Sequence, residues 1–419
     1  MSLLEKFRDK VSKIKDPGAG KSAEFDVMYS TGFLSIDYLN GTTVYVESKD
    51  RNFKYNSVGI VDGSANTIIG RSGSGKSTLI MQICGNIVRP FIQKGMDAEL
   101  YIDDIEGSLP EARKFFLLGL TNEQYNEHVD LRNDGITTEN VLSRITTIRN
   151  LKVENKKEYE YDTGLYDMNG ERIFKLIPTV YVIDSLPLLL PKDVQEDDSL
   201  GSNMTGSSVA KQNTLLVKKI VQLCKEANII LFTVNHINDD IQMGFIPKAA
   251  QISGLKQGER LPGGRAALYL ANNMFRVDDS RTLKESDAYG IDGSIVTLTL
   301  IKSRTNASKR SVPLIFNKSE GKFDEILSLF ELLKQEGAFS GAGAYQYLDD
   351  CPDIKFSQKT FKETIENSPE LQKAFASKAY SILVNYLSDT KSKMLDESNA
   401  ANNVMNMFNE IANKDQGVA

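Results

Sequence analysis

The sequence predicts an α/β fold with a central, mostly parallel β-sheet and a small, mainly helical segment at its C-terminal end. Two observations lead to this prediction. Between about residues 24 and 325, short apolar runs alternate with longer runs of helical periodicity, and this alternation is typical of parallel strands whose faces are covered by helices. After residue 325, the large apolar residues recur at helical spacing.

The elements of the central part can be placed in chain order. The sequence predicts a strand at 65–69, a glycine-rich turn, a helix at 77–92, and further strands at 99–102, 179–183 and 229–234. Two segments interrupt the alternation. Residues 42–57 are polar and aromatic, and residues 159–175 carry Asn169-Gly170 between two β-prone arms, which indicates a hairpin. We expect both segments to decorate the core without carrying chemistry.

The two ends of the chain differ from the middle. Residues 1–23 begin with an amphipathic helix, whose apolar face includes Leu3, Phe7 and Val11, followed by a Pro-Gly-rich link. This helix either docks on its own domain or forms an assembly arm that packs on a neighbouring subunit. Residues 326–419 are predicted to form a helical C-terminal domain with a polar tail, and residues 24–325 form the core.

Composition bounds the class of protein. The chain has 419 residues, of which 41% are hydrophobic and 25% charged, a balance typical of a soluble globular protein with two or three domains. It has no apolar run near the ~20 residues that cross a bilayer, and no signal-peptide pattern. Cys84, Cys224 and Cys351 lie far apart, and we interpret them as buried thiols in a reducing cytoplasm.

The net charge of −6 is unfavourable for a nucleic-acid-binding protein. Net charge does not describe its distribution, however. Residues 302–310 contain four basic residues and no acid, and residues 248–265 contain four basic residues and one acid. A basic surface on an acidic protein therefore remains compatible with the sequence.

The most specific motif follows the first predicted strand and precedes a helix. It fits the phosphate-loop pattern, and with the next residue it comprises Gly70, Arg71, Ser72, Gly73, Ser74, Gly75, Lys76, Ser77 and Thr78. Glycines let backbone N–H groups surround phosphate oxygens, and the helix N-terminus adds partial positive charge. Lys76 is predicted to reach the terminal phosphates of ATP, and Ser77 to bind Mg²⁺.

Polar residues follow the other predicted strands. Asp184 ends an apolar strand, where its carboxylate is predicted to bind the metal through water. Asp103, Asp104 and Glu106 follow the second strand, and chemistry alone leaves all three open as the group that orients the attacking water. His236 follows the fourth strand at the same predicted edge, where a polar residue can contact the γ-phosphate.

Five segments together resemble the RecA-class strand-exchange recombinases, in particular the bacteriophage UvsX type. Their order and approximate spacing match that class over residues 24 to 325. They are Ser30 to Asp37 before the phosphate loop, Tyr101 to Gly107, Val234-Asn235-His236, Leu261 to Arg265 with its paired glycines, and Lys302-Ser303-Arg304-Thr305.

The resemblance implies roles for these residues. Glu106 becomes the catalytic base and His236 the γ-phosphate sensor, while Lys302 and Arg304 act in the ATP site of a neighbouring subunit. Two long loops, 191–210 and 238–265, would contact DNA without reading sequence. In the second loop the residues implied are Lys248, Lys256, Arg260, Gly263, Gly264 and Arg265.

A DNA-dependent ATPase with Mg²⁺ follows from the resemblance. It would form a helical filament on single-stranded DNA, exchange strands with homologous duplex DNA, and work with loader and single-strand-binding proteins in the cytoplasm, that of the host if phage-encoded, without a membrane. Segments 42–57 and 159–175 have no counterpart in the class, and the tail is not strongly acidic. Two alternatives remain: a hexameric DNA helicase with the same core, and a non-catalytic recombination mediator.

Overall fold

The computed structural model describes residues 27–47, 52–167, 170–196, 206–239, 254–262, 269–341 and 343–387. The predicted N-terminal helix, the polar tail and parts of both predicted DNA loops lie outside these residues. Within the described part, no helix is both long and apolar enough to span a membrane. The three cysteines are free thiols and buried, as predicted.

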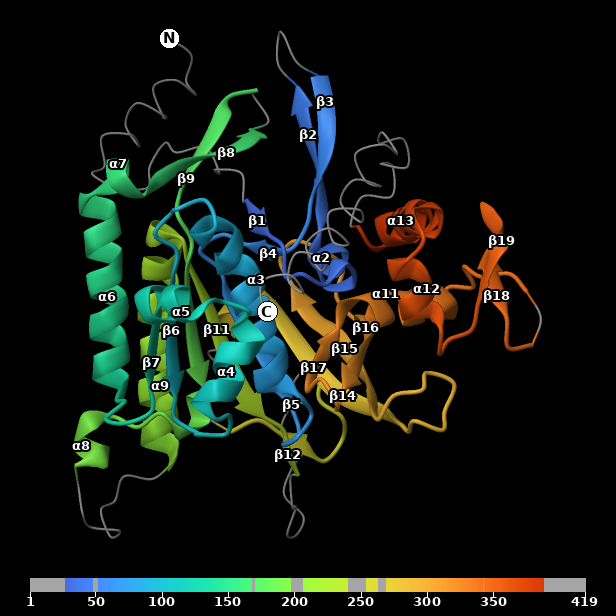
Figure 1. Ribbon diagram of the computed structural model, residues 1–419. Coiled ribbons are helices and arrows are strands. Elements are labelled where there is room, and N and C mark those ends of the chain that lie inside the picture. Colours follow the sequence, from blue (N-terminus) through green and yellow to red (C-terminus); the bar gives the residue numbers. More distant parts are fainter. Residues whose placement is uncertain are drawn as a thin grey trace, which may run out of the picture.

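A nine-stranded sheet forms the centre of the molecule (Figure 1). Its strands, from one edge to the other, are β17 (Lys322–Asp324), β16 (Arg310–Asn317), β15 (Gly293–Ser303), β14 (Asn273–Leu283), β5 (Ala65–Gly70), β11 (Ile229–His236), β10 (Thr179–Asp184), β6 (Glu99–Asp104) and β7 (Val129–Arg132). Strands β14 to β7 pair in parallel, whereas β14 to β17 pair antiparallel. The predicted α/β fold with a mostly parallel sheet is confirmed.

Helices cover both faces of the parallel strands. Val180 and Val182 of β10 belong to the same buried cluster as α3 (Lys76–Ile92) and α4 (Glu111–Leu118). Tyr181 and Ile183 belong to the cluster of α6 (Thr138–Glu154) and α9 (Gly206–Ala227). Because successive side chains of a strand point to opposite faces, a strand that is apolar throughout indicates two helical layers.

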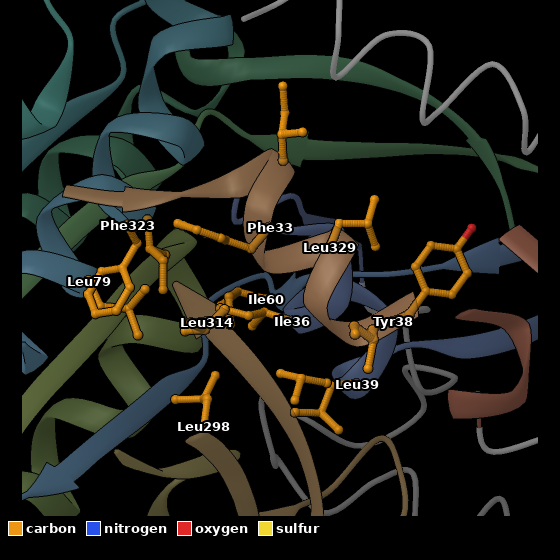
Figure 2. Close-up of a cluster of buried hydrophobic side chains, with 14 of the residues drawn as sticks. Phe33, Ile36, Tyr38, Leu39, Ile60, Leu79, Leu298, Leu314, Phe323 and Leu329 are labelled. Atoms are coloured by element: carbon orange, nitrogen blue, oxygen red, sulfur yellow. The ribbon is translucent and has the colours of Figure 1, made fainter. Parts of the chain in front are cut away.

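The antiparallel half of the sheet packs on α2 (Leu34–Asn40). Figure 2 shows Phe33, Ile36 and Leu39 of this region packed among Leu298, Leu314 and Leu329, which come from β15, β16 and α11 (Glu325–Gln335). Asp37 fixes the start of the helix by accepting hydrogen bonds from the backbone N–H and hydroxyl of Thr31, at 2.8 and 2.6 Å. The spacing of Thr31 and Asp37 before the phosphate loop therefore has a local structural explanation.

The two segments that interrupt the alternation are both hairpins, as the second was predicted to be. They are β2 (Thr42–Glu47) with β3 (Asn52–Ser57), and β8 (Glu160–Tyr166) with β9 (Arg172–Leu176). They touch each other, since the Tyr55 hydroxyl donates to the Tyr166 carbonyl at 3.1 Å. Figure 1 shows both at the top of the molecule, away from the turn after β5.

The C-terminal part continues the core. It contains α11, a hairpin of β18 (Gln346–Leu348) and β19 (Cys351–Phe356), then α12 (Phe361–Glu366), α13 (Pro369–Leu383) and the 3-10 turn η2 (Val384–Tyr386). The hairpin was not predicted. Phe330 and Phe361 stack at 4.2 Å within one buried cluster that extends into the central sheet. The division into domains at residue 325 stays a prediction.

The remaining elements are short. They are β1 (Met28–Tyr29), β4 (Ile60–Val61), α5 (Asn122–His128), α7 (Lys156–Tyr159), the 3-10 turn η1 (Leu186–Leu188), α8 (Lys192–Gln195), β12 (Asn238–Asp239) and β13 (Glu259–Arg260). The segment 191–210, predicted as one long loop, is partly helical. Helix α8 begins it, and α9 starts at Gly206.

Candidate functional site

Four parallel strands end side by side at one edge of the sheet, which we call the carboxyl edge. In the strand register, Gly70 pairs with His236, and Asp104 pairs with Asp184. A cavity at this edge is lined by residues 72–78 and by more distant residues that include Glu106, His236, Asp279 and Phe316. Ligands of α/β sheets bind beyond the carboxyl ends of the strands. The fold therefore brings residues 72–78, Glu106 and His236, out of the larger set of predicted site residues, around one cavity.

The phosphate-loop segment connects β5 to α3, as the pattern requires. Gly75 has a φ of 85°, and a Cβ there would lie 2.9 Å from the Phe323 ring. Gly70 and Arg71 were also predicted to contact nucleotide, but neither lines the cavity. The Arg71 side chain is exposed and instead pairs with Asp239 of β12 at 2.6 Å. The Arg71 carbonyl accepts a hydrogen bond from Lys76.

Lys76 is the first residue of α3 and is almost wholly buried, with 4% of its surface exposed. Its Nζ donates to the Arg71 carbonyl at 2.7 Å. Burial lowers the pKa of this lysine, while the negative charges of Asp184, Glu106 and Asp279 act in the opposite direction. A phosphate group next to Lys76 would satisfy its ammonium group better than a single carbonyl does, because it carries full negative charge.

Ser77 and Asp184 meet across the site. The Ser77 hydroxyl donates to Asp184 Oδ2 at 2.7 Å, and Asp184 Oδ1 is buried with no hydrogen-bond partner among the described residues. Burial raises the pKa of Asp184 to about 6, against the hydrogen bond from Ser77. A hydroxyl and a carboxylate with a free buried oxygen suit Mg²⁺, which prefers oxygen ligands and retains waters.

The structure separates the three acids that follow β6. Asp103 accepts a hydrogen bond from the Tyr181 hydroxyl and pairs with Arg144 at 2.8 Å, on the α6 side of the sheet. Asp104 is buried against the ammonium group of Lys114. Of the three, Glu106 alone lines the cavity. Geometry thus agrees with the choice of Glu106 that the resemblance implies, and gives Asp103 and Asp104 structural partners.

His236 lies directly opposite Glu106. Its Nε2 is 2.9 Å from Glu106 Oε2, and both side chains are partly exposed to the cavity. The neighbouring Asn235 donates to the Pro262 carbonyl at 3.0 Å, while its own Oδ1 is buried without a hydrogen-bond partner in the described part of the chain. The strand that carries His236 is therefore linked to the end of the predicted second DNA loop.

The described parts of that loop form its base. Strands β12 and β13 pair antiparallel, so that Asn238 faces Arg260. Arg260 is exposed, and Lys256 is largely exposed, with its Nζ 3.7 Å from Asp278. The other predicted DNA-binding residues, Lys248, Gly263, Gly264 and Arg265, lie outside the described residues.

Lys302 and Arg304 are far from the cavity of their own chain. Lys302 pairs in register with Met274 near the start of β14, and β14 runs parallel to β5. Both residues therefore lie toward the amino ends of the parallel strands, whereas the phosphate loop lies at their carboxyl ends. Their side chains donate to the carbonyls of Tyr269 and Leu270. Neither side chain lines the cavity of its own chain.

Sequence reasoning missed several residues at the site. Asp279 lines the cavity from β14, and its pKa is raised by burial and by Asp278. Arg276, also on β14, pairs with Glu259 of β13 at 2.6 Å and so anchors the base of the second loop. Lys114 supports the Glu106 loop from α4. These residues follow no strand end, so no local signal marked them.

Comparisons with known proteins give no assignment: no protein-family model matches the chain, and no curated protein matches it either.

Among the described residues, no group of three or more His, Cys, Asp or Glu side chains could bind a metal ion by itself. A Mg²⁺ ion at Ser77 and Asp184 would therefore need nucleotide phosphates and water as its other ligands.

Proposed function

We propose that the protein is an ATPase that assembles on single-stranded DNA and catalyses homologous strand exchange. The observation that supports the ATPase part is a cavity lined by the phosphate-loop segment and by the pair Glu106–His236. Asp184 does not line this cavity but accepts a hydrogen bond from Ser77, which does. The strand-exchange part rests on the resemblance of five segments to RecA-class recombinases. The RecA-like identity of the core is part of the same proposal.

Different residues at the cavity would have different roles in phosphoryl transfer. Lys76 would bind the terminal phosphates, with the backbone N–H groups of the loop around them. Glu106 would accept a proton from water as the water oxygen bonds to the γ-phosphorus and the bond to the bridging oxygen of ADP breaks. A bound Mg²⁺ would neutralise phosphate charge, and Ser77 and Asp184 are the residues that would bind it.

The pair His236–Glu106 gives the site a way to respond to nucleotide. A γ-phosphate in the cavity would compete with Glu106 for the imidazole of His236. Contact with phosphate would therefore move His236 and leave Glu106 available for water. Because Asn235 bonds to the Pro262 carbonyl, the same change would reach the second DNA loop. This is an order–disorder switch of the kind that phosphate-loop proteins use.

Filament assembly is the part of the proposal that concerns neighbours. Lys302 and Arg304 lie away from their own cavity, a position that fits cations acting on the ATP of an adjacent subunit. Partners would then be single-stranded DNA, homologous duplex DNA, further copies of the chain, and loader and single-strand-binding proteins. The proposed setting is a cytoplasm, that of a host cell if the chain is phage-encoded.

Electron microscopy with single-stranded DNA and a non-hydrolysable ATP analogue tests the proposal. A recombinase should form helical filaments whose presence requires both DNA and nucleotide. Closed rings would indicate a hexameric helicase, and neither rings nor filaments would indicate a mediator. Lys76→Ala protein is the control, because it should fail to form the nucleotide-dependent assembly.

A further inference from the structure

The loop that carries Glu106 is fixed at both of its ends. At its start, the backbone N–H groups of Ile105 and Glu106 both donate to the Asp184 carbonyl, at 2.7 and 3.1 Å. One residue later, the Gly107 N–H donates to Asp104 Oδ1 at 2.9 Å. The loop therefore has defined anchors on each side of the proposed base.

Lys114, which lies on α4 outside the loop, adds two further hydrogen bonds to it. Its Nζ donates to Asp104 Oδ2 and, at 2.7 Å, to the Leu109 carbonyl. The side chains of Lys114 and Asp104 are 6% and 3% exposed. One ammonium group thus connects the last residue of β6 to the far end of the Glu106 loop, and both Ser108 and Leu109 line the cavity.

The helix that carries Lys114 is itself tied to the phosphate-loop helix. A Cβ at Gly85 of α3 would lie 2.3 Å from the Leu118 carbonyl of α4, so the two helices approach as closely as glycine allows. Arg89 of α3 also donates to the Leu118 carbonyl, at 2.8 Å. Contacts therefore run from α3, whose first residue is Lys76, through α4 to the 104–109 loop that carries Glu106.

A buried ion pair is weak support for stability. Removing two charges from water costs several kcal/mol per ion, and well-packed apolar residues often stabilise a protein as much or more. The Lys114–Asp104 pair does something that an apolar pair could not do. Lys114 donates to the Leu109 carbonyl and Asp104 accepts from the Gly107 N–H, so the pair holds two backbone groups of the loop that lines the cavity with Glu106, Ser108 and Leu109.

We propose that Lys114 is a positioning residue for the reaction, which sets the distance between Glu106 and the phosphates by bracing the 104–109 loop against α3. The inference rests on the proposed ATPase function. A displacement of about 1 Å in a reacting group can cost about a hundredfold in rate. Lys114 itself touches neither the cavity nor the reacting atoms, so its effect must pass through Glu106.

Lys114→Met tests the inference, with Lys152→Met as the matched control. Lys152 is a second buried lysine, which donates to the Ile177 carbonyl and the Thr179 hydroxyl near the starts of the strands. Steady-state ATP hydrolysis with Mg²⁺ and single-stranded DNA should show kcat about tenfold to a hundredfold lower for Lys114→Met. The Kd for a fluorescent ATP analogue should stay within about twofold, since the phosphate cradle is intact. Lys152→Met should keep wild-type kcat.

Urea denaturation at several temperatures shows at which of them all variants are folded, and hydrolysis is measured at such a temperature. If Lys114→Met does not fold, Asp104→Asn decides: it keeps the shape, weakens the bond to Lys114, and should also lower kcat at unchanged Kd. An unchanged kcat in the folded variant, or an equal fall in Lys152→Met, would overturn the brace while leaving the ATPase in place. Absence of hydrolysis in wild-type protein would remove the proposed function, and the brace with it.

Discussion

The two edges of the parallel sheet treat buried polar groups in opposite ways. At the amino edge, where the strands begin, Asn228 uses its side chain fully: it accepts from the Gly63 N–H at 3.0 Å and donates to the Tyr29 hydroxyl and the Leu176 carbonyl. At the carboxyl edge, buried oxygens of Ser74, Asp184 and Asn235 have no hydrogen-bond partner among the described residues.

This difference supports the carboxyl edge as the candidate functional site of the sheet. A buried polar group without a partner costs about 1–3 kcal/mol, and a ligand bound at the carboxyl edge would offset this cost for the oxygens of Ser74, Asp184 and Asn235. At the amino edge, both the oxygen and the nitrogen of the Asn228 side chain have hydrogen-bond partners. At the carboxyl edge, buried oxygens lack partners in the described part of the chain. The phosphate-loop segment and Glu106 lie at this edge.

The largest expected effects come from one substitution at each edge, Lys76→Ala at the carboxyl edge and Asn228→Ala at the amino edge. Lys76→Ala should abolish ATP hydrolysis and nucleotide-dependent DNA binding, because it removes the cation proposed to bind the terminal phosphates. The protein should stay folded, because among the described residues the Lys76 side chain donates one hydrogen bond, to the Arg71 carbonyl. Asn228→Ala should do the reverse, lowering the free energy of unfolding by about 1–3 kcal/mol without changing kcat. Phosphate release and urea unfolding measure both. Normal turnover in Lys76→Ala would mean that the site is wrongly assigned.

The second effect concerns the cations that lie away from the carboxyl edge. Lys302→Ala combined with Arg304→Ala should reduce DNA-stimulated hydrolysis by about a thousandfold, the lower end of what a trans-acting arginine supplies, with the fold intact. Mixing this variant with Glu106→Gln protein should restore part of the activity, because each supplies what the other lacks. No recovery at any ratio, with co-assembly shown independently, would count against action in a neighbouring site.

A smaller effect should appear in the pH dependence of stability at the amino edge. Burial lowers the pKa of Lys152 to about 7, below that of an unfolded lysine. Between about pH 7 and 10 the unfolded chain therefore binds a proton that the folded protein lacks, and the free energy of unfolding should rise with pH by up to about 1.4 kcal/mol per unit. In Lys152→Met this rise should be absent. Equal slopes for the two proteins in urea titrations across that range would contradict the assignment.

The smallest effect concerns the second predicted DNA loop. Replacing Lys248, Lys256 and Arg260 together with Ala should weaken binding to single-stranded DNA equally for every sequence. The slope of log affinity against log salt should fall by about 0.7 for each phosphate that is no longer neutralised, or about 2 for all three side chains. ATP binding without DNA should be unaffected. A salt titration with a labelled strand measures the slope, and an unchanged slope would place the DNA elsewhere.

The sequence predicted best what local pattern controls. Gly75, Lys76 and Asp184 each follow an apolar strand, and the ends of parallel strands meet at one edge, so their gathering could be foreseen. Strand β14 was missed because charged residues such as Arg276 and Asp279 interrupt its apolar pattern. These residues belong to the site only through strand pairing over long distances in the sequence.

Lys114 was missed for a related reason. It lies in the run Glu111-Ala112-Arg113-Lys114, which resembles the exposed face of an ordinary helix. Only the close approach of α4 to α3 buries its ammonium group against Asp104. The hairpin of β18 and β19 was likewise overlooked, because the helical spacing of the apolar residues around it dominated the interpretation of the C-terminal part.

The most direct test of the account compares wild-type protein with Glu106→Gln in ATP hydrolysis, with Mg²⁺ and with and without single-stranded DNA. Wild-type protein should hydrolyse ATP, faster with DNA. Glu106→Gln should bind nucleotide and DNA normally but turn over about 10²–10⁴-fold more slowly, because the substitution removes the base and keeps the shape. Wild-type turnover in Glu106→Gln, or no hydrolysis by the wild-type protein under any of these conditions, would contradict the assignment of this edge of the sheet as an ATPase site.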